Sequence, residues 1–305
     1  MIFIVNPISG NSHKNQIVTR LQKSGYEVVF TEYAGHAEII ARNTNARKVI
    51  AVGGDGTVNE VARGIMGTDK ILGIIPCGSG DGLALHLGLN HNLNRSIKII
   101  EEGKTSPLDA GIINGKPFFS VCGTGFDALI SEKFAKSGKR GLANYIEQAV
   151  RTWKDYNPDR YTIEIDGKSW ETEAVLITVG NSNQWGNGAK VTPLADSTDG
   201  ELDITVVDKF KNIEIPMLAY RLMSGTVNED LHVHCYRGRH ITIRRPDAGP
   251  ALGDGDWFEA GNILDIEVIP HAINVLVPDE TTVLKRLTIF AEYNKLDSLW
   301  RIRIS

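Results

Sequence analysis

The sequence lacks several features that would assign it to common classes of protein. It has only three cysteines in 305 residues, Cys77, Cys122 and Cys235. Their odd number and wide spacing form neither a disulfide framework nor a zinc-binding pattern, so we expect three buried or unreactive thiols. No apolar run approaches the roughly 18 residues of a membrane-spanning helix, and the apolar stretch at 1–5 is too short for a signal-peptide core. These absences predict a soluble, cytoplasmic protein.

An excess of positive charge is also missing. Lys and Arg total 33 against 37 Asp and Glu, which gives a formal net charge of −4. Because domains that bind nucleic acids are usually strongly basic, we expect no nucleic-acid partner. Hydrophobic residues make up 42% and charged residues 23% of the chain, close to the globular average, which excludes a disordered chain. The length corresponds to about two domains of roughly 150 residues.

Glycine, in contrast, is abundant and unevenly placed. Ten of the 31 glycines lie between Gly53 and Gly88. The excess is therefore local, and its meaning depends on the segments around it.

The first hundred residues alternate between strand and helix patterns. Apolar runs typical of buried strands occupy 2–5, 26–31, 48–52 and 71–76, and helix-like stretches occupy 37–41, 57–66, 83–87 and 97–102. This alternation predicts an α/β domain with a parallel sheet over residues 1–106. Ligands of such sheets bind at the carboxyl ends of the strands.

From residue 107 onward strand patterns dominate. They occupy 117–121, 161–165, 174–179, 202–207, 240–244, 263–269 and 273–277, and helix-like stretches interrupt them near 127–135, 142–154 and 213–223. This pattern predicts a second, β-rich domain over 107–280, built as a sandwich or a barrel. The basic, partly alternating tail, 281–305, favours packing back on the first domain over a contact with a membrane surface, because one short basic segment anchors weakly.

The sharpest local signal is the loop from Gly53 to Glu60, with the sequence GGDGTVNE. It follows a strand and precedes a helix, so its glycines allow close approach of backbone N–H groups to phosphate oxygens at a helix N-terminus. Thr57 would cap the helix or donate to a phosphate. Asp55 would bind Mg²⁺, or accept a hydrogen bond or proton from a hydroxyl. A plain tight turn is the simpler alternative, but it needs fewer glycines.

Two other strand ends carry similar sequences. One is the loop CGSGDG at 77–82, and the other is NPISGN at 6–11. Three such strand ends indicate a nucleotide site more strongly than any one of them. The P-loop sequence GxxxxGK[ST] is absent, and the GTGFDA stretch at 123–128 is a weak dinucleotide fingerprint because it lies in the β-rich half.

These segments together resemble the diacylglycerol kinase catalytic family, which includes bacterial diacylglycerol kinases, YegS-like lipid kinases and sphingosine kinases. The resemblance continues through TEYAGHA at 31–37, DSTDGEL at 196–202 and GDGD at 253–256. It implies an α/β nucleotide domain, similar to those of NAD kinases and phosphofructokinases, followed by a β-sandwich domain. The implied function is ATP-dependent phosphorylation of a lipid hydroxyl, of a diacylglycerol-like or sphingoid lipid.

The resemblance also implies which residues form the site. ATP contacts would come from Asn6, Pro7, Ser9, Gly10, Asn11, Thr31, Gly53, Gly54, Asp55, Gly56, Thr57, Val58, Asn59 and Ser79. A magnesium site would use Asp199 as a carboxylate ligand, with backbone oxygens of Asp196 and Glu201. The catalytic carboxylates would be Asp55, Asp254 and Asp256, the last two as candidate proton acceptors.

Two residues depart from the family pattern. Asp81 stands where the second loop usually carries asparagine, and its charge would weaken ATP binding or require a cation. Asp256 stands in place of the usual glutamate, which shortens the reach by roughly 1 Å, a misplacement that can cost much of a reaction rate. On its own, the GDGD sequence is also typical of a β-turn between two strands, and the DSTDGEL segment of an acidic surface loop.

Partners and alternatives follow from this resemblance. The substrate would be a lipid at a membrane surface, with the protein bound peripherally to the inner face of the membrane, and the sequence leaves a homodimer open. Two alternatives are a kinase for a soluble substrate such as NAD, and an inactive homologue that binds nucleotide or lipid without turnover.

Overall fold

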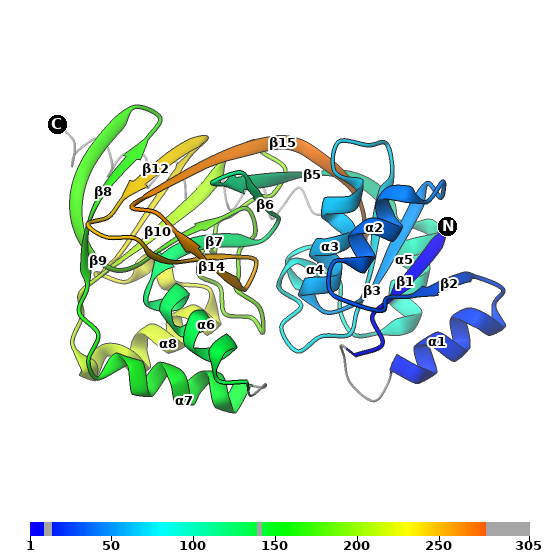
Figure 1. Ribbon diagram of the computed structural model, residues 1–305, viewed down its shortest axis with the longest axis horizontal. Helices are drawn as coiled ribbons and strands as arrows, with labels where there is room; N and C mark the ends of the chain where they lie inside the picture. Colours follow the sequence, from blue (N-terminus) through cyan, green and yellow to red (C-terminus); the bar gives the residue numbers. More distant parts are fainter. Residues whose placement is uncertain (9–13, 139–141, 279–305) are drawn as a thin grey trace.

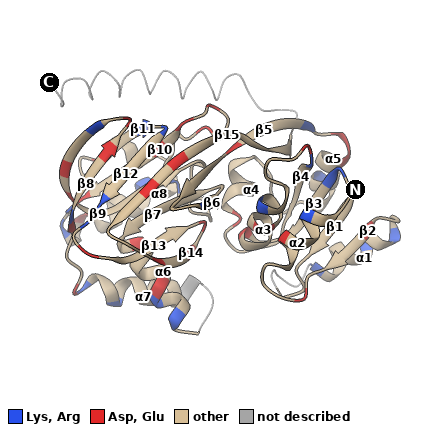
Figure 2. Cartoon of the chain, turned by 45° about the horizontal axis from the view of Figure 1, so that its top comes forward, with Lys and Arg blue, Asp and Glu red and all other residues tan. Residues whose placement is uncertain are grey.

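The computed structural model describes residues 1–8, 14–138 and 142–278, and in these residues the chain forms two lobes side by side (Figure 1). The predicted tail at 281–305 lies outside the described residues. Lys and Arg are scattered over both lobes among Asp and Glu (Figure 2).

The first lobe is an α/β unit with a parallel sheet, as predicted. Its strands are β1 (Ile2–Val5), β2 (Glu27–Phe30), β3 (Lys48–Gly53) and β4 (Ile71–Pro76), and they pair in the order β2-β1-β3-β4. Its helices are α1 (Lys14–Lys23), α2 (His36–Asn43), α3 (Asp55–Ile65), α4 (Gly82–His86) and α5 (Leu93–Glu102). All residues of β1 and β4 are buried, because helices cover a parallel sheet on both faces.

The second lobe is the predicted β-sandwich. Its strands are β5 (Lys104–Ile113), β6 (Lys116–Phe118), β7 (Val121–Gly125), β8 (Asp159–Ile165), β9 (Lys168–Gly180), β10 (Leu202–Asp208), β11 (Val233–Gly238), β12 (His240–Arg244), β13 (Gly249–Gly253), β14 (Asp256–Ala260) and β15 (Ile263–Val277). One layer runs β14-β13-β7-β9-β10-β11, and the other runs β9-β8-β12-β15-β5-β6. The two layers share β9 and enclose their own apolar core.

Helices cover the lower end of this lobe in Figure 1. They are α6 (Phe126–Lys136), α7 (Leu142–Trp153) and α8 (Ile215–Ser224), and two short 3₁₀ turns, η1 (Asn212–Glu214) and η2 (Val227–Glu229), flank α8. A small separate cluster of apolar side chains lies under α8.

Strand β15 corrects one expectation. The sequence predicted two strands, 263–269 and 273–277, but the structure contains one long strand with an irregularity in its pairing with β5 between Ile269 and Ile273. His271 has a positive φ of 52° there, so the chain forms a bulge and not a turn. Beyond the bulge, Asn274 and Val275 pair in parallel with β4. The antiparallel pair β5–β15 therefore crosses from one lobe to the other.

The predicted division between residues 106 and 107 falls inside β5. Each lobe has its own apolar core, but the first core includes side chains of β5 and of the last part of β15. The three cysteines are free thiols, as expected. Burial raises the pKa of Cys77 to about 11 and that of Cys235 to about 12.

Asp127, at the start of α6, gives a prediction about stability. It is 4% exposed, accepts the backbone N–H of Ala128, and lies 3.3 Å from the Thr178 hydroxyl. Burial raises its pKa to about 7, against about 3.9 in an unfolded chain. Because this pKa is higher in the folded state, the charged carboxylate destabilises the fold as pH rises from about 4 to 7.

We therefore expect Asp127→Asn to raise the free energy of unfolding at pH 8 by roughly 1–3 kcal/mol. The gain should shrink steadily as the pH falls toward about 4, where the wild-type carboxyl is neutral in both states. Urea unfolding at pH 8, 6 and 4.5 measures this. If Asp127→Asn is less stable than wild type at pH 8, the hydrogen bonds from Ala128 and Thr178 to the carboxylate stabilise the fold by more than its burial costs.

Candidate functional site

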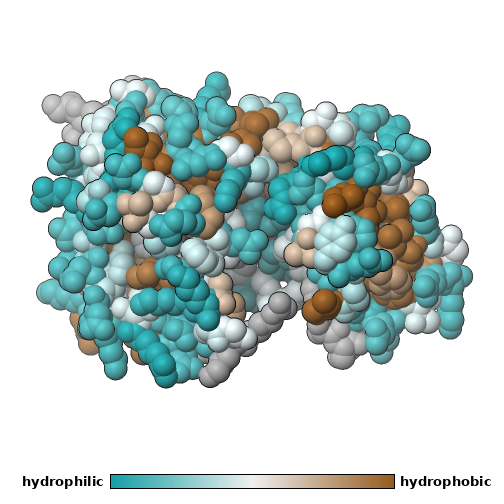
Figure 3. Space-filling model, in the orientation of Figure 1, coloured by the Kyte–Doolittle hydropathy of each residue, from teal (hydrophilic) through white to brown (hydrophobic). Residues whose placement is uncertain are grey.

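A pocket of about 640 Å³ lies at the carboxyl ends of the parallel strands. In the space-filling view the lobes meet around a hollow that opens at the lower edge (Figure 3). The pocket is lined by Asn6, Ile8, Thr31, Glu32, Tyr33, Ala34, Gly54, Asp55, Gly56, Thr57, Glu60, Gly78, Ser79 and Gly80. These residues follow β1, β2, β3 and β4, so four strand ends contribute to one site.

The predicted ATP contacts divide into three groups. The structure brings together seven of them around this pocket: Asn6, Thr31, Gly54, Asp55, Gly56, Thr57 and Ser79. Four do not line it: Pro7, Gly53, Val58 and Asn59. Val58 and Asn59 are buried within α3. Ser9, Gly10 and Asn11 lie outside the described residues.

Sequence reasoning predicted Thr31 after β2 but missed the three residues that follow it. Glu32, Tyr33 and Ala34 line the pocket, and the Tyr33 ring stacks on His36 with centroids 4.6 Å apart. Glu60 accepts the backbone N–H groups of Gly35 and Ala37 at the start of α2. The available signal was position, because the segment TEYAGHA directly follows a strand as the two glycine loops do.

The two glycine loops touch one another. A Cβ on Gly78 would lie 2.7 Å from the Gly54 Cα, and one on Gly54 would lie 3.1 Å from the Gly78 Cα. Distances this short leave no room for a side chain in either loop. The sequence therefore needs glycine at both positions so that the ends of β3 and β4 can form one continuous backbone surface.

Thr57 supplies a hydroxyl without a partner at the base of this surface. It is 4% exposed, and its Oγ1 has no hydrogen-bond partner among the described residues. Gly53 makes room for it, since a Cβ there would lie 2.5 Å from that oxygen. The hydroxyl lies in the first turn of α3, where the helix dipole favours an anion. These features fit a phosphate group at the N-terminus of α3.

Asp81 does not face the pocket as the sequence suggested. It is 1% exposed, and its carboxylate accepts the Gly78 N–H at 3.1 Å and pairs with His91 Nε2 at 2.7 Å. Its φ is 47°, a conformation that aspartate and asparagine tolerate better than most residues. The Asp81 carboxylate thus holds the second glycine loop from behind, with His91 as its side-chain partner.

Asp55 is the carboxylate that lines the pocket. It is half-buried and accepts backbone N–H groups of Asp81 and Gly82, so it also joins the two loops. Burial, and then the nearby Asp81 charge, raise the pKa of Asp55 to about 6. Its ionised form lacks a compensating charge, which suits a site for a cation or for a proton.

Asp254 lies in the turn of the β13–β14 hairpin. Asp254 and Gly255 have φ values of 50° and 88°, so the GDGD sequence does form a two-residue β-turn, with Gly253 paired to Asp256. The Asp254 carboxylate accepts the backbone N–H groups of Phe119, Ser120 and Val121 at 2.9, 2.7 and 3.3 Å. It fixes the hairpin to the chain before β7.

Asp256 comes directly after this turn and is exposed. Burial of its carboxyl raises its pKa, and Arg63 and Glu60 of α3 act on it through their charges. The charge of Asp55 in turn acts on Asp254. The structure therefore brings the three predicted catalytic carboxylates to the face between the lobes. Their catalytic roles stay predictions.

A loop of the second lobe, residues 182–188, completes this face and was missed by sequence reasoning. The Asn187 N–H donates to the Gly80 carbonyl at 2.9 Å, and a Cβ on Gly82 would lie 3.3 Å from the backbone of Trp185. His86 accepts the Asn183 N–H. These contacts join segments about a hundred residues apart, which no local pattern could indicate.

The acidic segment 196–202 lies elsewhere and lines none of this pocket. Asp196 accepts the N–H and O–H of Thr198, whereas Asp199 and Glu201 pair with Arg237 at 2.5 and 2.6 Å. Across the described part of the chain, no group of three or more His, Cys, Asp or Glu side chains could hold a metal ion. The Arg237 guanidinium supplies positive charge here. The predicted magnesium site, with the Asp199 carboxylate and backbone oxygens of Asp196 and Glu201, stays a prediction.

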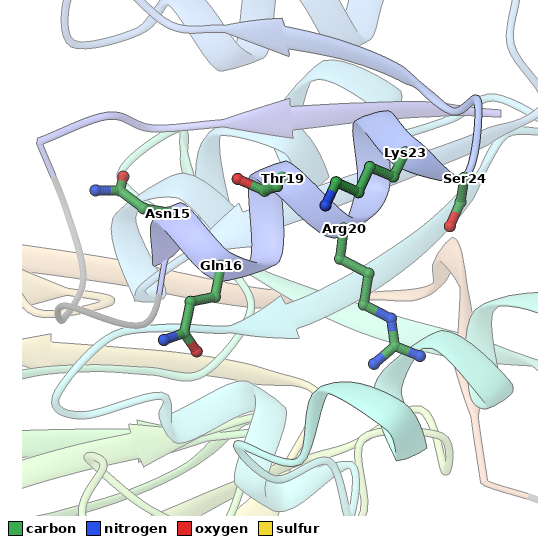
Figure 4. A pocket seen from close by; sticks show the side chains of 6 residues that line it. All are labelled: Asn15, Gln16, Thr19, Arg20, Lys23 and Ser24. Carbon is green, nitrogen blue, oxygen red and sulfur yellow. The ribbon is translucent and has the colours of Figure 1, made fainter.

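A second hollow, of about 490 Å³, runs along α1 (Figure 4). Asn15, Gln16, Thr19, Arg20, Lys23 and Ser24 line it, and their side chains diverge instead of meeting at one point (Figure 4). It adds nothing to the site between the lobes.

Comparison with solved structures shows that the two lobes form a known fold. The structure aligns with an NAD kinase from Archaeoglobus fulgidus in complex with ATP at a TM-score of 0.56 and 11% identity, covering 95% of this chain and 97% of that one. It aligns with a putative diacylglycerol kinase from Bacillus anthracis at a TM-score of 0.75 and 24% identity, covering 92% and 98%. These likenesses show the fold.

The family follows from the sequence models. Residues 1–113 match the diacylglycerol kinase catalytic domain, and residues 120–277 match the YegS C-terminal NAD kinase beta sandwich-like domain. The second match spans more than half of the chain, so the chain belongs to the family of this YegS C-terminal domain, and its first 113 residues are similar to the diacylglycerol kinase catalytic domain.

Curated relatives cover nearly all of the chain. A diacylglycerol kinase of Bacillus subtilis is 27% identical over 293 residues, 91% of this chain and 96% of that protein. A probable YegS-like lipid kinase of Klebsiella pneumoniae is 26% identical over 268 residues, 80% of this chain and 82% of that protein. Among the described residues no helix is long and apolar enough to cross a membrane.

Proposed function

We propose that the protein transfers the γ-phosphoryl group of ATP to a hydroxyl group of a lipid such as diacylglycerol. The observation that carries this proposal is the pair of touching glycine loops, with the unpartnered Thr57 hydroxyl and the Asp55 carboxylate in one pocket. The family membership and the names of its relatives support lipid as the acceptor.

The pocket fits the triphosphate of ATP. Backbone N–H groups at the start of α3, the Thr57 hydroxyl and the Ser79 side chain would hold phosphate oxygens. Tyr33, whose ring is 56% exposed beside the pocket, offers a flat surface on which the adenine base would stack. Mg²⁺ accompanying the nucleotide would neutralise phosphate charge, and Asp55, whose own charge lacks compensation, is the carboxylate that would hold it.

The acceptor hydroxyl would lie between the lobes, next to Asp256. As the hydroxyl oxygen attacks the γ-phosphorus, Asp256 takes its proton, the bond to the β-phosphate oxygen breaks, and ADP leaves. Asp254 acts as a positioning residue, because its carboxylate is occupied by three backbone N–H groups and holds the hairpin that carries Asp256. Positioning and charge neutralisation supply most of the catalysis in such reactions.

The test is a phosphorylation assay with radiolabelled ATP. Purified protein is incubated with Mg²⁺ and mixed micelles of diacylglycerol, monoacylglycerol, a sphingoid base, ceramide or phosphatidylglycerol, with NAD as a soluble acceptor. We expect label in one lipid class and loss of labelling with a chelator. Labelled NAD would favour the soluble-substrate alternative. ATP binding without any labelled product would overturn the kinase proposal in favour of an inactive homologue.

We expect Gly78→Ala to weaken ATP binding at least tenfold. Its Cβ would lie 2.6 Å from Asp81 Oδ1 and 2.7 Å from the Gly54 Cα, so the two loops must separate and their N–H groups no longer converge on the phosphates. Titration calorimetry with a non-hydrolysable ATP analogue measures the change. Gly261→Ala is the matched control, because a Cβ there meets nothing within 4 Å. Equal affinity in both variants would contradict the proposed phosphate site.

A further inference from the structure

Helix α8 carries apolar side chains on more than one side, yet none of its residues is buried. Its sequence is IPMLAYRLMS, with Arg221 and Ser224 as the polar exceptions. A surface helix normally turns its apolar side chains toward the protein core. In the described part of the chain, Leu218 and Leu222 pack on the apolar cluster beneath α8, whereas Met217, Tyr220 and Met223 are exposed.

Apolar side chains are exposed on this side of α8 and on its flanking turns. Met217, Tyr220 and Met223 are 54%, 67% and 58% exposed. Together with exposed apolar side chains next to them, they form a set that we call the α8 face. Its members are Ile213, Ile215, Met217, Tyr220, Met223 and Leu231. Leu231 is 91% and Ile213 is 84% exposed. Their chain neighbours are in contact, because His232 Nε2 lies 3.2 Å from Glu214 Oε1. Exposed apolar patches of this kind mark interaction sites.

Lysine side chains at the edge of the α8 face offer contacts to an anionic partner. Of the neighbouring carboxylates, Asp230 pairs with Arg221, and Glu214 lies 3.2 Å from His232 Nε2, a partner that is charged only when it is protonated. Lys209 and Lys211 are exposed at its edge, and among the described residues neither forms an ion pair. Glu214 and Glu229 are acids nearby, so the two lysines provide local positive charge without a net positive excess. An apolar surface edged by lysine is the pattern of elements that lie in a membrane interface.

The α8 face is also connected to the site between the lobes, which we call the cleft. The Lys190 N–H donates to the carbonyl of Leu222 at 2.8 Å, and three residues earlier the Asn187 N–H donates to the Gly80 carbonyl at 2.9 Å. A Cβ on Gly188 would lie 3.8 Å from the Met223 side chain. One short segment thus joins the end of α8 to the second glycine loop.

We propose that the α8 face docks on the surface of a lipid bilayer that contains anionic phospholipid. Its apolar side chains enter the headgroup boundary while Lys209 and Lys211 contact phosphate groups. This inference rests on the proposed function, because a lipid acceptor has to reach the cleft from a bilayer. It adds which surface of the protein meets that bilayer and why lipid charge matters.

Flotation with vesicles tests the proposal without turnover. The full chain is mixed with vesicles of phosphatidylcholine alone, or of phosphatidylcholine and phosphatidylglycerol at 7:3. We expect wild type to float with the anionic vesicles, and the triple variant Met217→Ser, Tyr220→Ser, Met223→Ser to bind at least tenfold less. Ile39→Ser is the matched control, since Ile39 is an exposed aliphatic side chain on the other lobe; it should float like wild type. Circular dichroism checks that each variant is folded.

Equal flotation of the triple variant and wild type would overturn the proposal. So would a wild-type dimer that the triple variant dissociates in sedimentation velocity, which would assign the face to a second copy of the chain. A third outcome would also overturn it. If a fragment of residues 1–278 floats with the vesicles and the full chain does not, the occupant of the α8 face would be residues 279–305 of the chain itself.

A paired activity assay separates this inference from the proposed function. With a water-soluble dihexanoyl-glycerol the triple variant should keep wild-type turnover, and with long-chain diacylglycerol in vesicles it should lose at least tenfold. If wild type phosphorylates neither lipid, the proposed function fails while flotation still decides the docking surface. Equal turnover of variant and wild type on vesicles would count against the docking surface alone.

Discussion

Replacing Asp55 by asparagine is expected to lower the turnover number for lipid phosphorylation by roughly 10²- to 10⁴-fold, while the protein stays folded. The carboxylate lines the pocket and accepts N–H groups from the second glycine loop. Asparagine keeps an acceptor for one of these contacts but removes the charge that would hold the cation of the nucleotide. Initial rates in the mixed-micelle assay measure the loss.

The stability of the same variant distinguishes a functional carboxylate from a structural one. Because the folded-state pKa of Asp55 is raised to about 6, its carboxyl lowers the stability of the fold progressively between about pH 4 and 6, and the full loss is present at pH 8. Asp55→Asn should therefore be at least as stable as wild type at pH 8. Asp69→Asn, an exposed aspartate of the same lobe outside the pocket, is the control for rate. A large drop in melting temperature at pH 8 would make Asp55 mainly a brace between the loops.

Asp254→Ala is expected to destabilise the protein by at least about 3 kcal/mol and to abolish activity. Three backbone N–H groups lose their acceptor, each at roughly 1–3 kcal/mol when left buried, and alanine must adopt the positive φ of the turn, which costs roughly 1–2 kcal/mol. The hairpin that carries Asp256 then loses its attachment to the start of β7. Thermal and urea unfolding measure the loss of stability.

A second Asp-Gly turn supplies the control. Asp166 and Gly167 connect β8 to β9 with φ values of 47° and 83°, and Asp166 is exposed and accepts N–H groups of Arg239 and His240. Asp166→Ala should lose less stability and keep activity. Asp254→Asn separates the effect of the turn conformation from the effect of the carboxylate. Asparagine tolerates the positive φ, but its amide N–H₂ group would face a backbone N–H donor and could not accept from it. An Asp254→Asn variant with wild-type stability and activity would contradict the positioning role.

The α/β lobe was largely predictable because its central strands are continuous apolar runs that end at glycine or proline. The run at 71–76 coincides with β4, and the run at 48–52 is one residue shorter than β3. The expected strand at 117–121 is two strands, β6 and β7. Strands β5, β11, β13 and β14 were missed. They are partly exposed, and β13 begins Gly-Pro, so neither a buried run nor a clean alternation marks them.

Only those parts of the site that depend on neighbouring residues in the sequence were predictable. The strand-end argument located both glycine loops and Asp55. It could not show that Asp81 turns away, because that depends on a backbone φ of 47° and on His91 ten residues later. The loop at 182–188 escaped for a different reason, since its contacts with the second glycine loop exist only in the assembled fold.

Strand β15, which crosses between the lobes, also determines when the sheet of the first lobe can be completed during synthesis. Asn274 and Val275, near the end of the described chain, pair with Ile71 and Leu72 of β4. The ribosome therefore produces β4 about two hundred residues before the strand that covers its outer edge. Until then that edge is open to pairing with other chains, a known route to aggregation. A fragment that ends after the first lobe is thus expected to be insoluble, even though its sequence contains the whole phosphate-binding pattern.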